Sequence, residues 1–261
     1  MNDEKMKFFG LIPAGGTGSR LGKMPCSKEV FPIVRKTGDT IERTVICENL
    51  IRYYRLADIS NIYFIIRSGK WDIPAYLGDG KDLGVNISYL IMNLPHGTPF
   101  TLDQAYPFVR GHNVALGFPD MVCTPENLFA RLREKLVHTD ADVVLGLTRV
   151  QTYKSWDMIE FDGDKIKDII IKEDRPDLAY GWSNAVWGPA FTEFLHEHLQ
   201  TRVARNELTT KACDGTLREL YVGDVIRAAI RKGFKVEYVI FETGTAIDLG
   251  IPAALEKFLK G

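Results

Sequence analysis

Short apolar runs alternate with amphipathic segments along the first half of the chain. The apolar runs predict buried strands at 8–13, 61–66, 85–92, 113–118 and 141–148. Apolar positions at helical spacing predict helices at 40–56 and 125–136. Buried strands that alternate with helices are typical of a parallel sheet covered on both faces. We therefore expect an α/β fold with ligands beyond the carboxyl ends of the strands.

The second half of the chain has a different pattern. It predicts a hairpin over 158–166 that turns at Gly163, followed by a strand at 168–172. Helices are expected at 191–199, 222–232 and 252–260, and a late strand at 236–241. Because no linker rich in Pro, Gly or Ser separates the halves, we expect a single domain over residues 1–261.

Composition and charge exclude several classes of protein. Hydrophobic residues make up 45% of the chain, which is enough for a sizeable core and excludes long-range disorder. The net charge of −1 gives no overall field for nucleic acid or an anionic membrane. There is no secretory signal pattern and no apolar run near the roughly 20 residues that span a bilayer. The four cysteines are dispersed, so we expect no disulfide framework or structural zinc and a cytoplasmic location.

The glycine-rich segment after the first strand is the most informative one. Gly15, Gly16 and Gly18 let backbone amides approach an anion closely, and Arg20 and Lys28 add two cations nearby. The spacing matches neither the Walker loop nor the dinucleotide-binding fingerprint. The alternative is a tight turn between a strand and a helix that binds nothing.

The segment 12–33 resembles the signature of the sugar-1-phosphate nucleotidyltransferases, which include glucose-1-phosphate thymidylyltransferases and uridylyltransferases. The resemblance lies in AGGTGSRLG, in Lys28 and in the triplet Phe31-Pro32-Ile33. It continues through 95–97, 117–120, Lys172 and 247–252. It implies a Rossmann-like three-layer α/β/α fold with a mainly parallel mixed central sheet. Residues 1–150 would be the nucleotide-binding half and residues 151–261 the sugar-phosphate-binding half, and homo-oligomers are common in such families.

The resemblance also implies a site that acts on phosphates with Mg²⁺. Arg20, Lys28 and Lys172 would be the catalytic cations, and Asp120 and Asp248 would hold the metal ion. Two carboxylates suit a hard cation that also binds substrate phosphates. From the residues alone, either aspartate could instead be a helix cap or a turn residue.

Further residues take binding roles from the same resemblance. Those expected to bind the nucleotide are Ala14, Gly15, Gly16, Thr17, Gly18, Ser19, Asn93, Gly97 and Gln104. Lys172 would hold the sugar phosphate, with Arg175 as a competing candidate because three residues separate Lys172 from Pro176. Trp182, Asn184 and Trp187 are candidates to face the sugar, although Trp is as common in a core.

The function implied is the condensation of a nucleoside triphosphate, dTTP or UTP, with a sugar 1-phosphate. An in-line attack on the α-phosphorus would release pyrophosphate, and an already ionised nucleophile needs no general base. The alternatives are a cytidylyltransferase for a non-sugar phosphate or phosphonate, a non-catalytic sensor of nucleotide sugars, and a glycosyltransferase. Small-molecule substrates are expected, and neither nucleic acid nor a membrane. The sugar, the base and the oligomeric state remain open.

Overall fold

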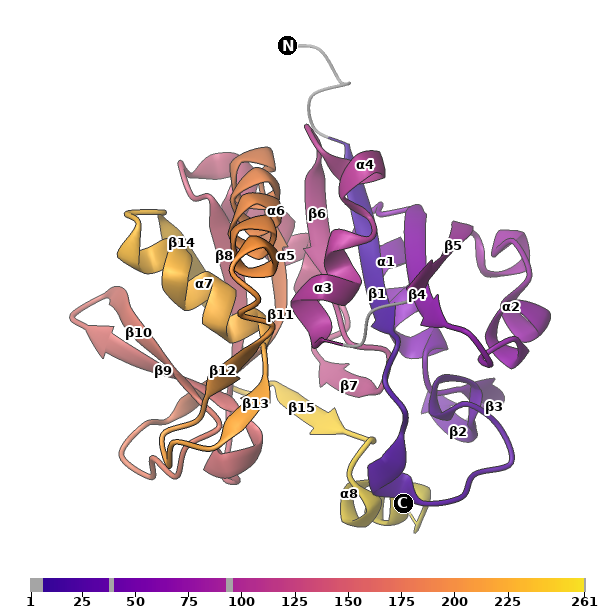
Figure 1. Ribbon diagram of the computed structural model, residues 1–261. Helices are drawn as coiled ribbons and strands as arrows, with labels where there is room; N and C mark the ends of the chain where they lie inside the picture. The colour runs from indigo at the N-terminus through magenta and orange to yellow at the C-terminus, as the bar shows by residue number, and fades with distance from the viewer. Residues whose placement is uncertain (1–6, 38–39, 93–95, 261) are drawn as a thin grey trace.

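A computed structural model describes residues 7–37, 40–92 and 96–260. Its central sheet has the strand order β5-β4-β1-β6-β11-β8-β14, and β9 and β10 extend it from β11 (Figure 1). Strand β11 runs antiparallel to β6 and β8, whereas the β5-β4-β1-β6 and β8-β14 pairs are parallel. The strands are β1 (Phe8–Ala14), β4 (Asn61–Arg67), β5 (Asn86–Met92), β6 (Asn113–Leu116), β8 (Val143–Arg149), β9 (Asp157–Asp162), β10 (Lys165–Ile171), β11 (Tyr180–Trp187) and β14 (Val236–Ile240).

Helices cover both faces of this sheet, which confirms the three-layer α/β/α fold with a mainly parallel mixed sheet. Strand β1 shows why: Phe8 and Ile12 pack into one apolar cluster, and Phe9 and Leu11 pack into the other. The first cluster includes residues of α1 (Glu48–Leu56), α2 (Asp72–Leu77) and α5 (Leu128–His138). The second includes residues of α3 (Thr98–Asp103), α4 (Tyr106–Val109), α6 (Pro189–Ala204) and α7 (Val222–Arg231).

The helix expected at 40–56 is wrong over its first part. Residues 40–45 form β3 (Thr40–Val45), which pairs antiparallel with β2 (Pro32–Thr37), and the helix α1 begins only at Glu48. The apolar spacing fits a helix, but Thr44 and Val45 are β-branched and suit a strand once a partner strand is present.

Several strands, among them the eight-residue central strand β11 (Tyr180–Trp187), were not expected from the sequence. The hairpin predicted at 158–166 and the strand at 168–172 are together β9 and β10, and β11 supplies a central strand between β9 and β6. Two further pairs lie outside the main sheet: β12 (Thr209–Lys211) with β13 (Leu217–Glu219), and β7 (Met121–Thr124) with β15 (Thr245–Asp248).

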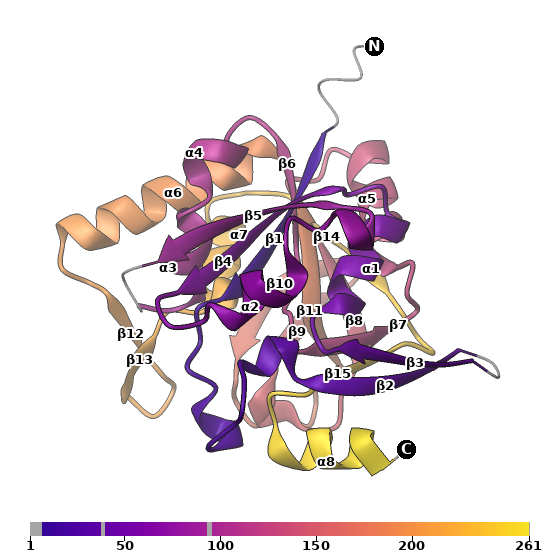
Figure 2. The same cartoon turned by 90° about the vertical axis from the view of Figure 1, so that its right-hand side faces the viewer.

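The end of the chain returns to the N-terminal half. Figure 1 shows α8 (Pro252–Lys260), in yellow, next to the indigo loop that follows β1. A small apolar cluster joins Leu249 and Leu255 to Ile33 and Ile46, with Leu21 of the loop packed against it. In the turned view, the β2–β3 hairpin extends beside β15 with α8 below it (Figure 2). None of the described helices is long and apolar enough to cross a bilayer.

Candidate functional site

A cavity of about 290 Å³ lies where β1 and β10 end and β11 begins; we call it the site cavity. Segments from both halves of the chain build its wall, as expected for the carboxyl edge of a parallel sheet. Its lining residues are Pro13, Gly16, Arg20, Lys28, Thr98, Phe118, Asp120, Met121, Ser155, Trp156, Asp157, Lys172, Trp182, Ser183, Glu219, Tyr221, Val222 and Asp248.

The glycine-rich loop forms one wall of the site cavity. Gly18 and Gly22 have φ angles of 68° and 70°, which L side chains adopt only with strain. Between them lies the short 3₁₀ turn η2 (Ser19–Leu21), which carries Arg20. Among the described residues, the N–H groups of Gly16 and Thr17 have no hydrogen-bond partner. These amides are therefore available to an anion.

Lys28 begins η3 (Lys28–Val30), and the residues on either side of it are held in place. Ser27 donates from its backbone N–H and its hydroxyl to the Asp72 carboxylate, at 2.6 and 2.7 Å. Glu29 is fully buried and accepts two hydrogen bonds from Lys70, at 2.7 and 2.9 Å. Two fixed contacts that flank Lys28 limit how far its side chain can move.

Asp120 and Asp248 lie 128 positions apart in the chain but meet at the site cavity. Strand β15 pairs antiparallel with β7, and Leu249 donates its backbone N–H to the Asp120 carbonyl at 2.8 Å. A Cβ atom at Gly250 would lie 2.7 Å from Asp120 Oδ2 and 2.8 Å from Asp248 Oδ1. Both carboxylates therefore converge on a glycine that leaves room for them.

Each carboxylate is paired with a cation from the glycine-rich segment. Lys28 Nζ lies 2.5 Å from Asp120 Oδ2, and Arg20 lies 3.3 Å from Asp248 Oδ2. Burial acts to lower the pKa of Lys28, but the surrounding carboxylates, Asp120 foremost, together outweigh it and the pKa stands above its usual value. Burial, and then the charge of Asp120, raises the pKa of Asp248. Two carboxylates so close favour a cation between them.

This donor set fits a magnesium ion that shares its coordination with substrate. Mg²⁺ is usually bound by one or two carboxylates together with phosphate oxygens and water. The described part of the chain holds no group of three or more His, Cys, Asp or Glu side chains suited to a metal ion. Asp120 and Asp248 would therefore need substrate oxygens to complete a coordination shell.

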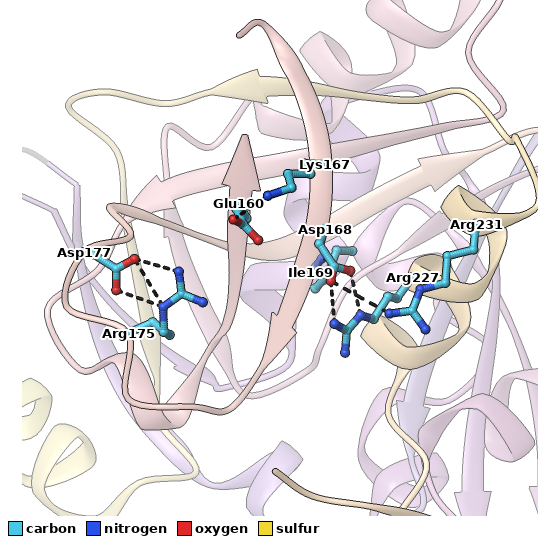
Figure 3. Close-up of polar contacts among 8 residues, drawn as sticks. All are labelled: Glu160, Lys167, Asp168, Ile169, Arg175, Asp177, Arg227 and Arg231. Atoms are coloured by element: carbon cyan, nitrogen blue, oxygen red, sulfur yellow. Dashed lines mark hydrogen bonds and ion pairs between the residues drawn. The ribbon is translucent and has the colours of Figure 1, made fainter. Parts of the chain in front are cut away.

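Lys172 and Arg175 lie in different surroundings. Lys172 lines the site cavity, and its φ of 51° is a left-handed conformation that costs a residue with a side chain about 1 kcal/mol or more. Its Nζ lies 3.9 Å from the centre of the Tyr221 ring. Arg175 instead forms a two-pronged ion pair with Asp177 at 2.6 and 2.9 Å, on the loop shown in Figure 3. The structure thus brings Lys172, and not Arg175, to the other cations.

The candidates for contact with the sugar also separate. Trp182 lines the site cavity, and its indole Nε1 is buried without a partner among the described residues. Asn184 is buried behind the cavity and donates to Ser183 Oγ at 2.8 Å and to Cys123 Sγ at 3.5 Å. Trp187 is a core residue whose Nε1 donates to Thr192 at 3.0 Å. Neither Asn184 nor Trp187 has the position that the sequence suggested, because both face the packed interior.

Sequence reasoning missed Asp157, Glu219 and Tyr221 on the cavity wall. Asp157 is 9% exposed, and its Oδ1 has no hydrogen-bond partner among the described residues. Burial raises the pKa of Asp157 to about 6, against the opposing effect of the Lys172 charge. An acidic residue directly before the apolar pair Met158-Ile159 was the available signal, but the hairpin was expected to begin one residue later.

The expected base-binding residues receive less support from the geometry. Asn93 lies outside the described residues. Gly97 precedes α3 with a φ of 108°, and a Cβ there would lie 2.2 Å from the Leu220 carbonyl oxygen. Gln104 ends α3 and donates to the Phe100 carbonyl at 3.4 Å. Gly97 therefore allows the close approach of α3 to the segment before α7, and Gln104 is engaged within its own helix.

Comparisons with known proteins agree with the fold and with the family that the sequence resembles. Glucose-1-phosphate thymidylyltransferase of Mycolicibacterium smegmatis is 31% identical over 169 residues, which cover 59% of this chain and 51% of that protein. The low-salt glycan biosynthesis nucleotidyltransferase Agl11 of Haloferax volcanii is 25% identical over 171 residues, covering 64% and 45%. The chain thus spans about half the length of these curated relatives. No protein-family model matches the chain.

Solved structures share the fold over nearly the whole chain. A putative glucose-1-phosphate thymidylyltransferase from Bacillus anthracis, in complex with sucrose, superposes with a TM-score of 0.81 at 19% identity, covering 97% of this chain and 94% of that one. A UDP-glucose pyrophosphorylase complexed with UDP-glucose gives a TM-score of 0.72 at 16% identity, covering 98% and 100%. In sequence and in fold, this chain therefore resembles the sugar-1-phosphate nucleotidyltransferases.

Proposed function

We propose that this protein transfers a nucleotidyl group from a nucleoside triphosphate to a sugar 1-phosphate, with dTTP or UTP as the donor. The observation that carries the proposal is the convergence of Lys28, Lys172 and two carboxylates on one cavity, beside backbone amides that have no partner in the part of the chain that the structure describes. A site that joins two anions needs cations on both and has little use for a general base.

The chain's residues divide the work between the two substrates. The loop amides and Arg20 hold the triphosphate, while Lys28 lies against the α-phosphate and stabilises charge there. Lys172 holds the acceptor phosphate on the opposite wall. An oxygen of that phosphate attacks the α-phosphorus, the bond from the α-phosphorus to the bridging oxygen breaks, and pyrophosphate leaves with the electron pair. Mg²⁺ on Asp120 and Asp248 would neutralise charge on the phosphate oxygens.

The side chains around Lys172 suit the rest of a sugar. Trp156, Trp182 and Tyr221 offer aromatic faces, and Asp157 offers a buried oxygen that lacks a donor among the described residues. A sugar combines apolar ring faces with hydroxyl donors, and this wall complements both.

The test measures pyrophosphate release with each of the common triphosphates against a panel of sugar 1-phosphates and non-sugar phosphates. Release that needs a sugar 1-phosphate and Mg²⁺ would support the proposal. Pyrophosphate release with a non-sugar phosphate would instead indicate a cytidylyltransferase for a non-sugar phosphate or phosphonate. Binding of a nucleotide sugar without any pyrophosphate release would indicate a non-catalytic sensor. An Asp248→Asn variant should require more Mg²⁺ for half-maximal rate, and an unchanged magnesium titration would contradict the metal role.

A further inference from the structure

A second and larger cavity, of about 440 Å³, lies behind the site cavity and between α6, α7, the end of β10 and the β12–β13 hairpin. We call it the basic cavity. It is lined by Ile171, Glu173, His198, Arg202, Thr210, Lys211, Ala212, Cys213, Arg218, Leu220, Asp224, Arg227, Ala228, Arg231 and Lys232.

Positive charge dominates the basic cavity. Six of its lining residues are Lys or Arg, whereas three carboxylates, Glu173, Asp224 and the adjoining Asp168, lie in or against it. Arg227 is paired with Asp168, and Arg231 lies 3.9 Å from the same carboxylate with a side chain 66% exposed (Figure 3). The cationic groups thus outnumber the available carboxylates, which is unfavourable unless an anion joins them.

Part of this charge has no partner within the described residues. Lys211 and Lys232 are in no ion pair there, and Arg202 Nε is buried without a hydrogen-bond acceptor. The pKa of His198 is lowered, first by burial and second by the positive charge of Arg202. This residue thus also lies in positively charged surroundings. A phosphate group is usually bound where several hydrogen-bond donors that lack acceptors surround the same cavity.

The basic cavity and the site cavity share a thin wall. Along the chain before α7, Arg218 and Leu220 line the basic cavity, whereas Glu219 and Tyr221 line the site cavity. At the end of β10 the pattern repeats, because Lys172 faces the site cavity between two residues that face the basic one. A ligand in one cavity therefore touches neighbours of residues in the other.

The Tyr221 ring connects the charges of the two cavities. Lys172 Nζ lies 3.9 Å from the ring centre and Arg218 Cζ lies 4.7 Å from it. Arg218 also forks onto Asp224 at 2.7 and 2.8 Å, and that carboxylate accepts the Tyr221 backbone N–H at 2.8 Å. An anion that binds the Arg218 guanidinium would therefore change the contact of Arg218 with the Tyr221 ring, which Lys172 also contacts.

We propose that the basic cavity is an effector site for a phosphorylated small molecule with at least two negative charges, and that its occupancy weakens binding of the acceptor phosphate at Lys172. The direction follows from charge, since a bound anion reduces the positive potential on both sides of the wall. The weaker binding of the acceptor phosphate rests on the proposed function, whereas binding of an anion to the basic cavity does not.

Binding is tested by alkylation of Cys213, which is exposed and lines the basic cavity. The probes are inorganic phosphate and 2,3-bisphosphoglycerate, and mass spectrometry follows the Cys213 peptide after treatment with iodoacetamide. The bisphosphate should slow alkylation in the wild type and in a control variant, Lys81→Gln/Arg110→Gln, that removes the same charges elsewhere. It should have no effect in Arg231→Gln/Lys232→Gln. Equal protection in both double variants, or no protection in the wild type, would overturn the site.

Coupling is tested in the pyrophosphate-release assay with the same proteins. The bisphosphate should raise the KM for the acceptor phosphate about fivefold, at the lower end of typical coupling between sites, and leave the KM for the triphosphate nearly unchanged. The effect should vanish in Arg231→Gln/Lys232→Gln. An equal effect in that variant would show direct competition at the site cavity and overturn the coupling. Because Cys213 protection needs no turnover, it stands or fails separately from the proposed function.

Discussion

Asp157 gives the most direct test of the electrostatics of the site cavity, because it is a buried carboxyl without full hydrogen bonding. Burial raises its pKa from 3.8 to about 6. The folded protein therefore binds more protons at this residue than the unfolded chain between these two values. Stability contributed by the protonated carboxyl is present at low pH and is lost as pH rises towards 6. The Asp157→Asn substitution removes this dependence.

The magnitude follows from the shift. A difference of about two pKa units corresponds to about 3 kcal/mol over the full titration, of which about 2 kcal/mol falls between pH 4 and pH 7.5. The free energy of unfolding of Asp157→Asn, relative to the wild type, should therefore rise by about 2 kcal/mol between those pH values. Urea unfolding of the ligand-free protein at a series of pH values measures it.

A matched control is Asp164→Asn, which changes an exposed carboxyl in the turn between β9 and β10. Its stability relative to the wild type should stay nearly constant across the same series. If the difference between Asp157→Asn and the wild type is also constant with pH, Asp157 is not the buried titrating group inferred here. In the activity assay, Asp157→Asn should raise the KM for the acceptor about tenfold through loss of one hydrogen bond to a charged group.

Three further substitutions test the geometry of the site and its support. Lys28→Ala should lower kcat by two to three orders of magnitude, from a loss of about 3–4 kcal/mol, while Lys23→Ala, in the exposed loop before η3, keeps nearly full activity; comparable rates would contradict the role of Lys28. Gly250→Ala should force two carboxylates apart and lower kcat about a hundredfold with little change in urea midpoint, whereas unaltered kinetics would show that the crowding is relieved elsewhere. Lys70→Ala should cost about 3–5 kcal/mol of unfolding free energy by leaving the Glu29 charge buried, and Glu29→Gln in the same background should recover most of it.

Local sequence was enough to predict the parts of the site that one short segment builds. The glycine-rich loop is such a part: the positive φ of Gly18, and the Gly16 and Thr17 amides that lack a partner among the described residues, depend on this short segment alone. The same is true of buried strands with a continuous apolar run, such as β1 and β4. For these elements the structure agrees with the sequence-based expectation.

Residues brought together by pairing of distant strands could not be predicted in this way. Asp120 and Asp248 are adjacent only because β7 and β15 pair, and both strands are too short to give a clear pattern. The resemblance to a known family suggested both residues, but neither carries a local signal. Asp157 and Tyr221 were missed for the same reason, because each faces the cavity through packing of α7 against β10.

In the proposed reaction, the pairing of cations and carboxylates in the site would let two anionic substrates enter without a large charge penalty. Lys28 and Arg20 neutralise Asp120 and Asp248, so the ligand-free site is close to balanced. The Arg20 side chain is 58% exposed, and an ion pair in that position is worth at most about 1 kcal/mol. Arg20 can therefore leave Asp248 for a phosphate at little cost. The more buried Lys28 gains by keeping its carboxylate while it contacts a phosphate, because partial removal from Asp120 would leave two poorly solvated charges. The exposed pair is thus suited to exchange partners on binding, and in the proposed reaction the buried pair would hold the reacting phosphate in place.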